Sequence, residues 1–226
     1  MLLNGAEQMG SPPHYVCFEG VESTGKSAQI PLVQSHLASL GFRCTVISEF
    51  PSEGEVITKI TSALRKSIFI SEGFPHGPES AFFYMLYADS LRRKGAECGA
   101  DILLQDRGID SSAIYQGYFA AKEHSCFPIR LRDSIEDLYH MLGIRLPDMI
   151  IVFQASIDVI KQRFMKREVR ELTEIEIVRI QELQHAYETL AKRSERYRIV
   201  NADDLSHQVT QTIVGHILES RSPSRT

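Results

Sequence analysis

Short apolar runs alternate with amphipathic segments along most of the chain. Apolar residues recur at helical spacing in segments that predict helices at about 26–40, 56–64, 79–94, 111–121, 135–142, 157–165, 174–193 and 205–218. Other runs are too short for helices and have the apolar, β-branched character of buried strands: Tyr15–Glu19, Arg43–Ser48, Asp101–Leu104, Met149–Phe153 and Tyr197–Val200. The alternation predicts an α/β fold with a five-stranded parallel sheet, right-handed crossovers and helices on both faces.

Local signals indicate where several of these helices begin and end. Gly41 stands where glycine is favoured just after a helix, and Thr173 with Glu176 forms a capping box. We expect Ser111 or Ser112 to cap the helix at about 111–121, and we expect 122–132 to be irregular. The helix after Thr173 is expected to turn one set of residues inward: Ile175, Val178, Leu183, Tyr187 and Leu190.

Composition limits the classes of function. A chain of 226 residues suits one domain, here 14–219, between flexible tails at 1–13 and 220–226. The formal net charge of −4, with no basic stripe, argues against nucleic-acid binding, so local arginines and backbone amides would have to hold an anionic ligand. Scattered cysteines, no signal peptide and no long apolar segment predict a cytoplasmic (intracellular) protein without a membrane partner.

The first strand runs straight into Gly20–Ser27, GVESTGKS, which matches the phosphate-loop pattern G-x-x-x-x-G-K-[ST]. The two glycines allow the backbone N–H groups to turn inward around phosphate, and the following helix adds its N-terminal dipole. Lys26 can reach the β- and γ-phosphates, and the Ser27 hydroxyl can ligate Mg²⁺. The predicted ATP-binding residues are Gly20, Glu22, Ser23, Thr24, Gly25, Lys26, Ser27 and Ala28.

Polar side chains follow the strands at the edge where ligands bind in parallel sheets. Glu19, Glu49, Asp106 and Gln154 are therefore expected to converge on one cleft with the phosphate loop. Asp106 can hold Mg²⁺ through water, and Arg107 offers a planar fork for phosphate oxygens. A surface ion pair is the alternative for these two residues, and we favour the functional interpretation.

Two further clusters each allow two interpretations. Arg163, Lys166, Arg167 and Arg170 form either a solvated charged surface or, as we favour, a mobile basic loop that closes on a triphosphate. The aromatic residues of the segment 79–94 are more typical of a core than of a ligand platform, although one could face a cleft: Phe82, Phe83, Tyr84 and Tyr87.

Several motifs together resemble thymidylate kinases in order from about Tyr15 to Leu218. Phe18-Glu19-Gly20 opens the phosphate loop, and Asp106-Arg107 precedes the stretch 111–117, SSAIYQG. Leu146-Pro147-Asp148 comes before the fourth strand, and the stretch 186–191, AYETLA, follows the basic cluster. The phosphate loop combined with D-R-x-x-x-S-S-x-x-Y-Q-G is far more specific than either half alone.

The resemblance implies the P-loop fold of nucleoside monophosphate kinases, a mobile lid at about 163–172 and transfer of the ATP γ-phosphoryl group to dTMP or a related monophosphate with Mg²⁺. ATP and a nucleoside monophosphate are thus the expected partners, and a homodimer is an expected assembly. It implies metal binding at Ser27 and Asp106, and catalytic roles for Lys26, Asp106, Arg107, Arg163 and Arg167. The acceptor-binding residues it implies are Glu19, Glu22, Phe50, Phe82, Phe83, Arg107, Ser111, Tyr115 and Gln116.

The chain departs from the family pattern at several positions, and no residue of the segment 79–94 matches the arginine that the family turns toward the base. Glu49 stands where many members have arginine, and Ser23 stands where some members have one. Gly108 replaces an aromatic residue, and Gln154 replaces an aspartate. Because Glu49 would face the acceptor phosphate, we predict weak binding of dTMP or a preference for another acceptor. A deoxynucleoside kinase and a nucleotide-binding regulatory protein without turnover are the alternatives.

Overall fold

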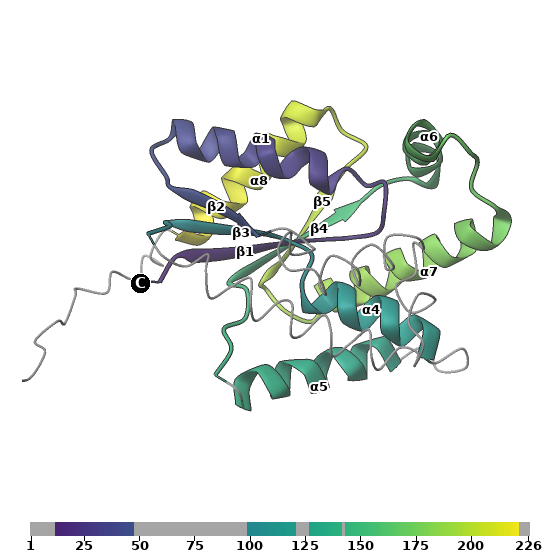
Figure 1. Ribbon diagram of the computed structural model, residues 1–226, viewed down its shortest axis with the longest axis horizontal. Coiled ribbons are helices and arrows are strands. Elements are labelled where there is room, and N and C mark those ends of the chain that lie inside the picture. The colour runs from purple at the N-terminus through teal and green to yellow at the C-terminus, as the bar shows by residue number, and fades with distance from the viewer. Residues whose placement is uncertain (1–11, 48–98, 121–126, 142, 222–226) are drawn as a thin grey trace, which may run out of the picture.

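Figure 1 shows the computed structural model of the chain, which describes residues 12–47, 99–120, 127–141 and 143–221. The helices expected at 56–64 and 79–94 lie outside these residues, as do Glu49, Phe50, Phe82 and Phe83. The described elements follow in the order β1 (His14–Glu19), α1 (Lys26–Ser39), β2 (Cys44–Ile47), β3 (Ile102–Asp106), α4 (Ile109–Ala120), α5 (Phe127–Met141), β4 (Met149–Gln154), α6 (Ile157–Glu168), α7 (Glu174–Ala191), β5 (Tyr197–Asn201) and α8 (Ser206–Arg221).

The five strands form one parallel sheet in the order β2-β3-β1-β4-β5. The α/β fold predicted from the apolar runs is therefore confirmed. In the register of the sheet, Phe18 lies opposite Asp106 and Glu19 lies opposite Val152. The carboxyl ends of β1 and β3 consequently meet at one edge, where the predicted phosphate loop begins.

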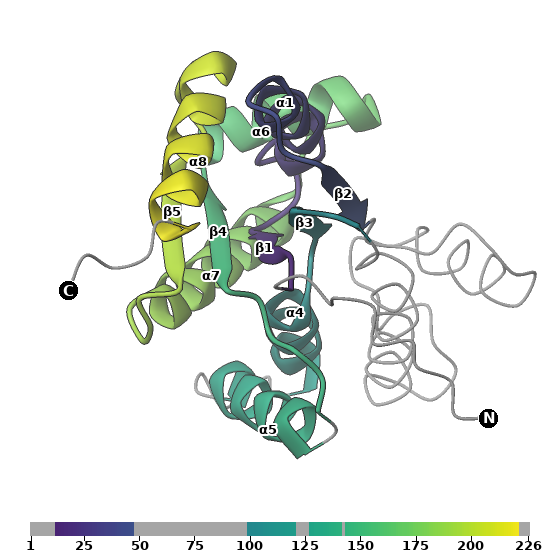
Figure 2. The same ribbon diagram turned by 90° about the vertical axis from the view of Figure 1, so that its left-hand side faces the viewer.

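Helices cover both faces of the sheet. Figures 1 and 2 show α1 and α8 together on one face and α4, α5 and α7 on the other. Strands β1 and β4 are buried along nearly their whole length, which explains why their sequences are continuous apolar runs. No helix in the described ranges is both long and apolar enough to cross a membrane.

Two predictions for helices α4 and α5 were wrong. Helix α4 begins at Ile109, so Ser111 and Ser112 lie in its first turn instead of capping it; the Ser112 hydroxyl donates to the Gly108 carbonyl at 3.3 Å. Helix α5 begins at Phe127 and includes residues that were expected to be irregular. Arg132 on α5 is buried because it pairs with Asp110 of α4, a tertiary contact that the apolar spacing does not report.

The boundary between α6 and α7 follows the predicted capping box. Thr173 Oγ1 accepts from the backbone N–H of Glu176 at 3.3 Å, and the Glu176 carboxylate accepts from the N–H of Thr173 at 2.9 Å. The predicted inner face of α7 is only partly right, because Ile175 and Val178 are exposed. The residues that α7 buries are Ile180, Leu183, Tyr187 and Leu190.

Candidate active site

The phosphate loop joins β1 to α1 in the conformation that its glycines permit. Gly20 has φ 128° and lies so close to β4 that a Cβ atom there would be 2.6 Å from the carbonyl oxygen of Phe153. Gly25 has φ 98° and directly precedes α1. Ser23 also has a positive φ of 59°, in a region that serine seldom adopts. These conformations lead the chain directly into the N-terminus of α1, the end of a helix that favours anions.

The Lys26 side chain lies inside this loop. Its Nζ donates to the carbonyl oxygens of Gly20 and Val21, both at 2.7 Å, and lies 3.4 Å from Thr24 Oγ1. Lys26 is buried, which focuses its positive charge on the loop. The loop thus holds a fixed ammonium group through its own carbonyl oxygens.

Ser27 and Asp106 bring together two oxygen groups that suit a magnesium ion. The Ser27 hydroxyl donates to Asp106 Oδ2 at 3.2 Å. Asp106 Oδ1 is buried and has no hydrogen-bond partner among the described residues. Mg²⁺ prefers hard oxygen ligands and keeps several waters, and it is commonly held by one or two protein oxygens plus substrate phosphates. The pair fits that donor set; the described part of the chain has no cluster of three or more His, Cys, Asp or Glu side chains placed to hold a metal.

Arg107 follows β3 in a left-handed conformation, with φ 60°. Its Nη1 donates to the Gly20 carbonyl at 3.1 Å and to Ser111 Oγ at 3.0 Å. The guanidinium stacks over the Tyr115 ring at 5.3 Å and pairs with Glu22 at 3.6 Å, while the Tyr115 hydroxyl donates to Glu22 at 2.7 Å. Arg107, Glu22 and Tyr115 therefore form one polar group beside the phosphate loop.

Glu19, the last residue of β1, is linked through Ser111 to the polar group of Arg107, Glu22 and Tyr115, and it is 1% exposed. Its Oε1 accepts from the backbone N–H groups of Gly108 at 2.8 Å and Ser111 at 3.3 Å. Its Oε2 accepts from the Ser111 hydroxyl and from the Tyr187 hydroxyl, the latter at 3.1 Å. Burial, followed by the charge of Asp110, raises the pKa of Glu19 to about 7, although the Ser111 hydrogen bond and Arg107 oppose this shift.

These contacts change the interpretation of two expected acceptor-binding residues. Glu19 and Ser111 are both buried; Ser111 accepts from Arg107, and Glu19 accepts from Ser111 and from the backbone of Gly108, the residue after Arg107. Their contact with an acceptor remains a prediction, and the geometry favours a positioning role for both. Gln116 lies on α4, but its side chain is outside what the structure describes.

The basic cluster divides into residues that reach the phosphate loop and residues that do not. Arg163 donates to the Thr24 carbonyl at 2.9 Å and to the Ala202 carbonyl at 2.7 Å, so it links α6 to the loop. Arg167 instead pairs with Glu168 at 2.7 Å, and Arg170 is held by Glu176. Arg163, Lys166 and Arg167 lie on α6 itself, so most of the expected basic loop is helical.

Two departures from the family pattern are accommodated by neighbouring side chains. A Cβ atom on Gly108 would lie 2.9 Å from Cys17 Sγ, so the cysteine fills the space beside this residue. Gln154 donates to Glu188 of α7 at 2.7 Å. It thus ties β4 to α7, and the expectation that it joins the phosphate-loop cleft remains a prediction.

Tyr187 is the residue whose connection to the site was not foreseen. The apolar spacing of α7 predicted a core residue, and Tyr187 is indeed buried. Its hydroxyl nevertheless contacts both Glu19 and Ser111 Oγ, the latter at 2.8 Å. The only signal in the sequence was its place in the stretch 186–191 that carries part of the resemblance.

A parallel sheet, a glycine loop that holds a lysine, and an Asp-Arg turn beside it define the class of P-loop kinases. A family model described as "Thymidylate kinase" matches residues 18–213. This chain belongs to the thymidylate kinase family. It is a nucleoside monophosphate kinase of that family and an ATP-dependent phosphotransferase.

Individual relatives are similar at modest identity. The chain is 31% identical over 160 residues to the thymidylate kinase of Thermoanaerobacter sp. (strain X514), an alignment covering 68% of this chain and 69% of the relative. It is 25% identical over 214 residues to the thymidylate kinase of Nitratidesulfovibrio vulgaris (strain DSM 19637 / Miyazaki F), covering 88% of this chain and 94% of the relative.

Proposed function

We propose that this chain transfers the γ-phosphoryl group of ATP to dTMP or a closely related monophosphate. The observation that carries this proposal is the convergence of Lys26, the Ser27–Asp106 pair and Arg107 at the carboxyl ends of β1 and β3. Phosphoryl transfer depends mainly on positioning and on stabilising charge, and these groups supply both.

Each group has a distinct task in this proposal. The loop amides and Lys26 bind the β- and γ-phosphates of ATP. Ser27 and Asp106 would hold Mg²⁺, and a bound Mg²⁺ would neutralise phosphate charge. Arg107 holds the acceptor phosphate in line with the γ-phosphate, and Glu22 and Tyr115 fix the direction of its guanidinium.

The cations of α6 complete the charge balance. Ser23 provides no positive charge in the loop, so Arg163 and Arg167 are the proposed source of the charge that stabilises the transferring group. Arg163 already contacts the loop, and Arg167 would approach it when 163–172 closes over ATP.

The test is ATP consumption by the purified protein with a panel of nucleosides and nucleoside monophosphates. Turnover with dTMP or another pyrimidine monophosphate is expected, together with a requirement for Mg²⁺. Asp106→Asn should raise the Mg²⁺ concentration needed for half-maximal rate. Turnover with nucleosides alone would instead indicate a deoxynucleoside kinase, and no turnover with any acceptor would contradict the proposal.

A further inference from the structure

The two residues between β3 and α4 decide where the Arg107 side chain lies. Strand β3 ends at Asp106 and α4 begins at Ile109, so Arg107 and Gly108 form the whole connection. Arg107 has φ 60°, a left-handed conformation that a residue with a Cβ atom adopts when its surroundings hold it there. We therefore looked for the groups that fix the peptide between Arg107 and Gly108.

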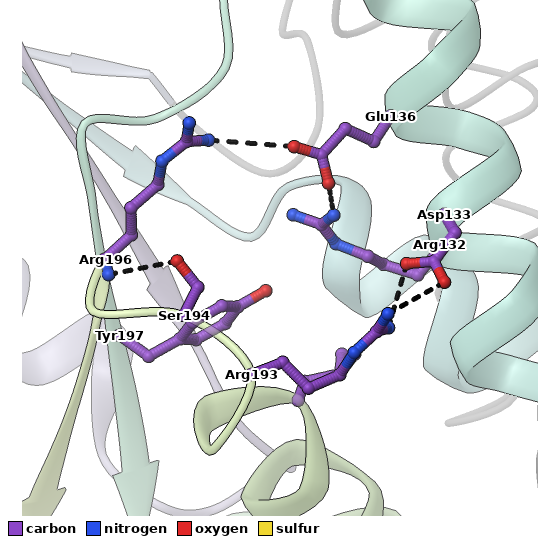
Figure 3. A pocket seen from close by; sticks show the side chains of 8 residues that line it. Arg132, Asp133, Glu136, Arg193, Ser194, Arg196 and Tyr197 are labelled. Carbon is purple, nitrogen blue, oxygen red and sulfur yellow. Dashed lines mark hydrogen bonds and ion pairs between the residues drawn. The ribbon is translucent and has the colours of Figure 1, made fainter.

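Both ends of this connection are anchored. Strand β3 lies inside the sheet, between β2 and β1. At the other end, the buried Asp110 in the first turn of α4 pairs with Arg132 of α5 at 3.1 Å. Arg132 also pairs with Glu136, at the wall of the cavity that Figure 3 shows. The adjustable part of the connection is thus the peptide group between Arg107 and Gly108.

Gln105 and Glu19 hold this peptide group from its two sides. Gln105 Nε2 donates to the Arg107 carbonyl oxygen at 2.8 Å, and the N–H of Gly108 donates to Glu19 Oε1 at 2.8 Å. If the peptide flipped, its carbonyl oxygen would turn toward the Glu19 carboxylate and away from the Gln105 amide, which is costly among buried polar groups. The contact with Gln105 therefore favours the left-handed conformation of Arg107.

A second contact fixes the direction of the Gln105 amide. A backbone carbonyl can only accept, so the part of the amide that contacts Arg107 is the N–H₂ group. The amide oxygen then faces β1, where the buried Tyr15 hydroxyl donates to it. The three preceding residues of β3 are apolar, and Gln105 is 0% exposed, so an apolar side chain would suit packing at this position. A buried amide that links Tyr15 to the Arg107 backbone indicates a role beyond packing.

We propose that Gln105 is a positioning residue, which holds Arg107 in the conformation that directs its guanidinium to the acceptor phosphate. The proposal rests on the function proposed above, in which Arg107 holds that phosphate. With its backbone held in this way, Arg107 reaches the Gly20 carbonyl at 3.1 Å and Ser111 Oγ at 3.0 Å. Its guanidinium is thereby oriented beside the phosphate loop in advance, and a preorganised group loses less freedom when it binds a ligand.

Gln105→Met tests this role, because methionine has a similar shape and makes neither hydrogen bond. Steady-state kinetics with dTMP and the other nucleoside monophosphates should show the KM for the monophosphate raised about fivefold or more, with the KM for ATP changed less than about twofold. Crystal structures of the wild-type and variant proteins should show the guanidinium of Arg107 displaced from Gly20. Leu104→Val is the matched control, since Leu104 is buried on the opposite face of β3. It should lower the melting temperature and leave both KM values unchanged.

Tyr15→Phe is a milder variant that keeps the ring and removes only the hydroxyl that orients the Gln105 amide. It should raise the KM for the monophosphate by a smaller factor than Gln105→Met does. The double variant should be no worse than Gln105→Met alone, because both changes act on Arg107 through the same chain of hydrogen bonds.

The outcomes separate this role from the proposed function. An unmoved Arg107 in the Gln105→Met structure would overturn the positioning role, and so would an equal rise in the monophosphate KM in Leu104→Val. A displaced Arg107 with an unchanged KM for the monophosphate would support the positioning of Arg107 by Gln105. It would instead contradict the assignment of Arg107 to the acceptor phosphate.

Discussion

The hydroxyl of Tyr187 donates a hydrogen bond to the buried carboxylate of Glu19 at 3.1 Å. This contact ties α7 to the strand that leads into the phosphate loop. Because the same carboxylate accepts from Gly108 and Ser111, it also fixes the start of α4. Arg107 lies two residues before that helix, donates to Ser111 and interacts with Glu19 through its charge, so its position depends on this carboxylate.

Glu19→Gln should weaken the use of the acceptor monophosphate more than the use of ATP. Above pH 7, where the Glu19 carboxylate is ionised, glutamine places an amide N–H₂ where at least one of these donors needs an acceptor, so the turn at Arg107 should shift. We expect the KM for the monophosphate to rise more than about tenfold, with a smaller change in the KM for ATP. Equal changes in both constants would indicate a general structural effect and contradict the positioning role.

The same substitution should change how stability depends on pH. The pKa of Glu19 is raised from 4.5 to about 7, so between these values the folded chain holds a proton that the unfolded chain has released. Stability from this group is therefore present at low pH and falls as pH rises through this window, by roughly 3 kcal/mol in total. Urea unfolding of both proteins at several pH values should show that the wild-type protein loses stability relative to Glu19→Gln up to about pH 7. A constant difference would contradict the raised pKa.

The parts of the site that lie close together in sequence could be predicted from it. The strand, the loop and Lys26 are contiguous, and Asp106-Arg107 follows an apolar run, so spacing alone locates them. The link between Glu19 and Tyr187 joins residues 168 positions apart, and no periodicity reports such a contact. The start of α5 was missed for the same reason. Arg132 in its first half is buried by an ion pair with Asp110 of α4, and the apolar spacing does not report that contact.

Lys26→Ala should abolish turnover while leaving the fold intact. We expect the rate to fall by on the order of 10²-fold or more, about 3 kcal/mol of transition-state stabilisation, since the ammonium serves the phosphates. The melting temperature should fall slightly, because the hydrogen bonds to Gly20 and Val21 are lost as well. Lys192→Ala is the control for removal of a lysine charge. A near-wild-type rate in Lys26→Ala would remove the phosphoryl-transfer assignment.

Arg167→Gln should lower kcat more than it raises the KM for ATP. Its described partners are the exposed Glu168 and the ring of Phe164, so its charge is available when 163–172 closes on the triphosphate. Arg170→Gln is the matched control because Arg170 is engaged with Glu176 through two hydrogen bonds. Steady-state kinetics should show a larger fall in kcat for Arg167→Gln than for Arg170→Gln. A change confined to KM would mean that Arg167 only binds nucleotide.

Glu49→Arg tests the identity of the acceptor. Glu49 itself lies outside the described residues, but β2 ends at Ile47 opposite Gln105, so the chain leaves this strand at the same edge as Arg107. A carboxylate there would repel the acceptor phosphate by roughly 4 kcal/mol per pair of charges at about 4 Å and an effective dielectric of 20.

We therefore expect the wild-type KM for dTMP to exceed the usual ~1 mM ceiling, or another monophosphate to be preferred. Glu49→Arg replaces this repulsion by attraction and should improve kcat/KM for dTMP at least about tenfold, while the KM for ATP stays unchanged. Glu49→Gln is the intermediate control, since it removes the repulsion without adding a cation. A micromolar KM for dTMP in the wild-type protein would show that Glu49 does not face the acceptor phosphate and that Arg107 holds this group without opposition.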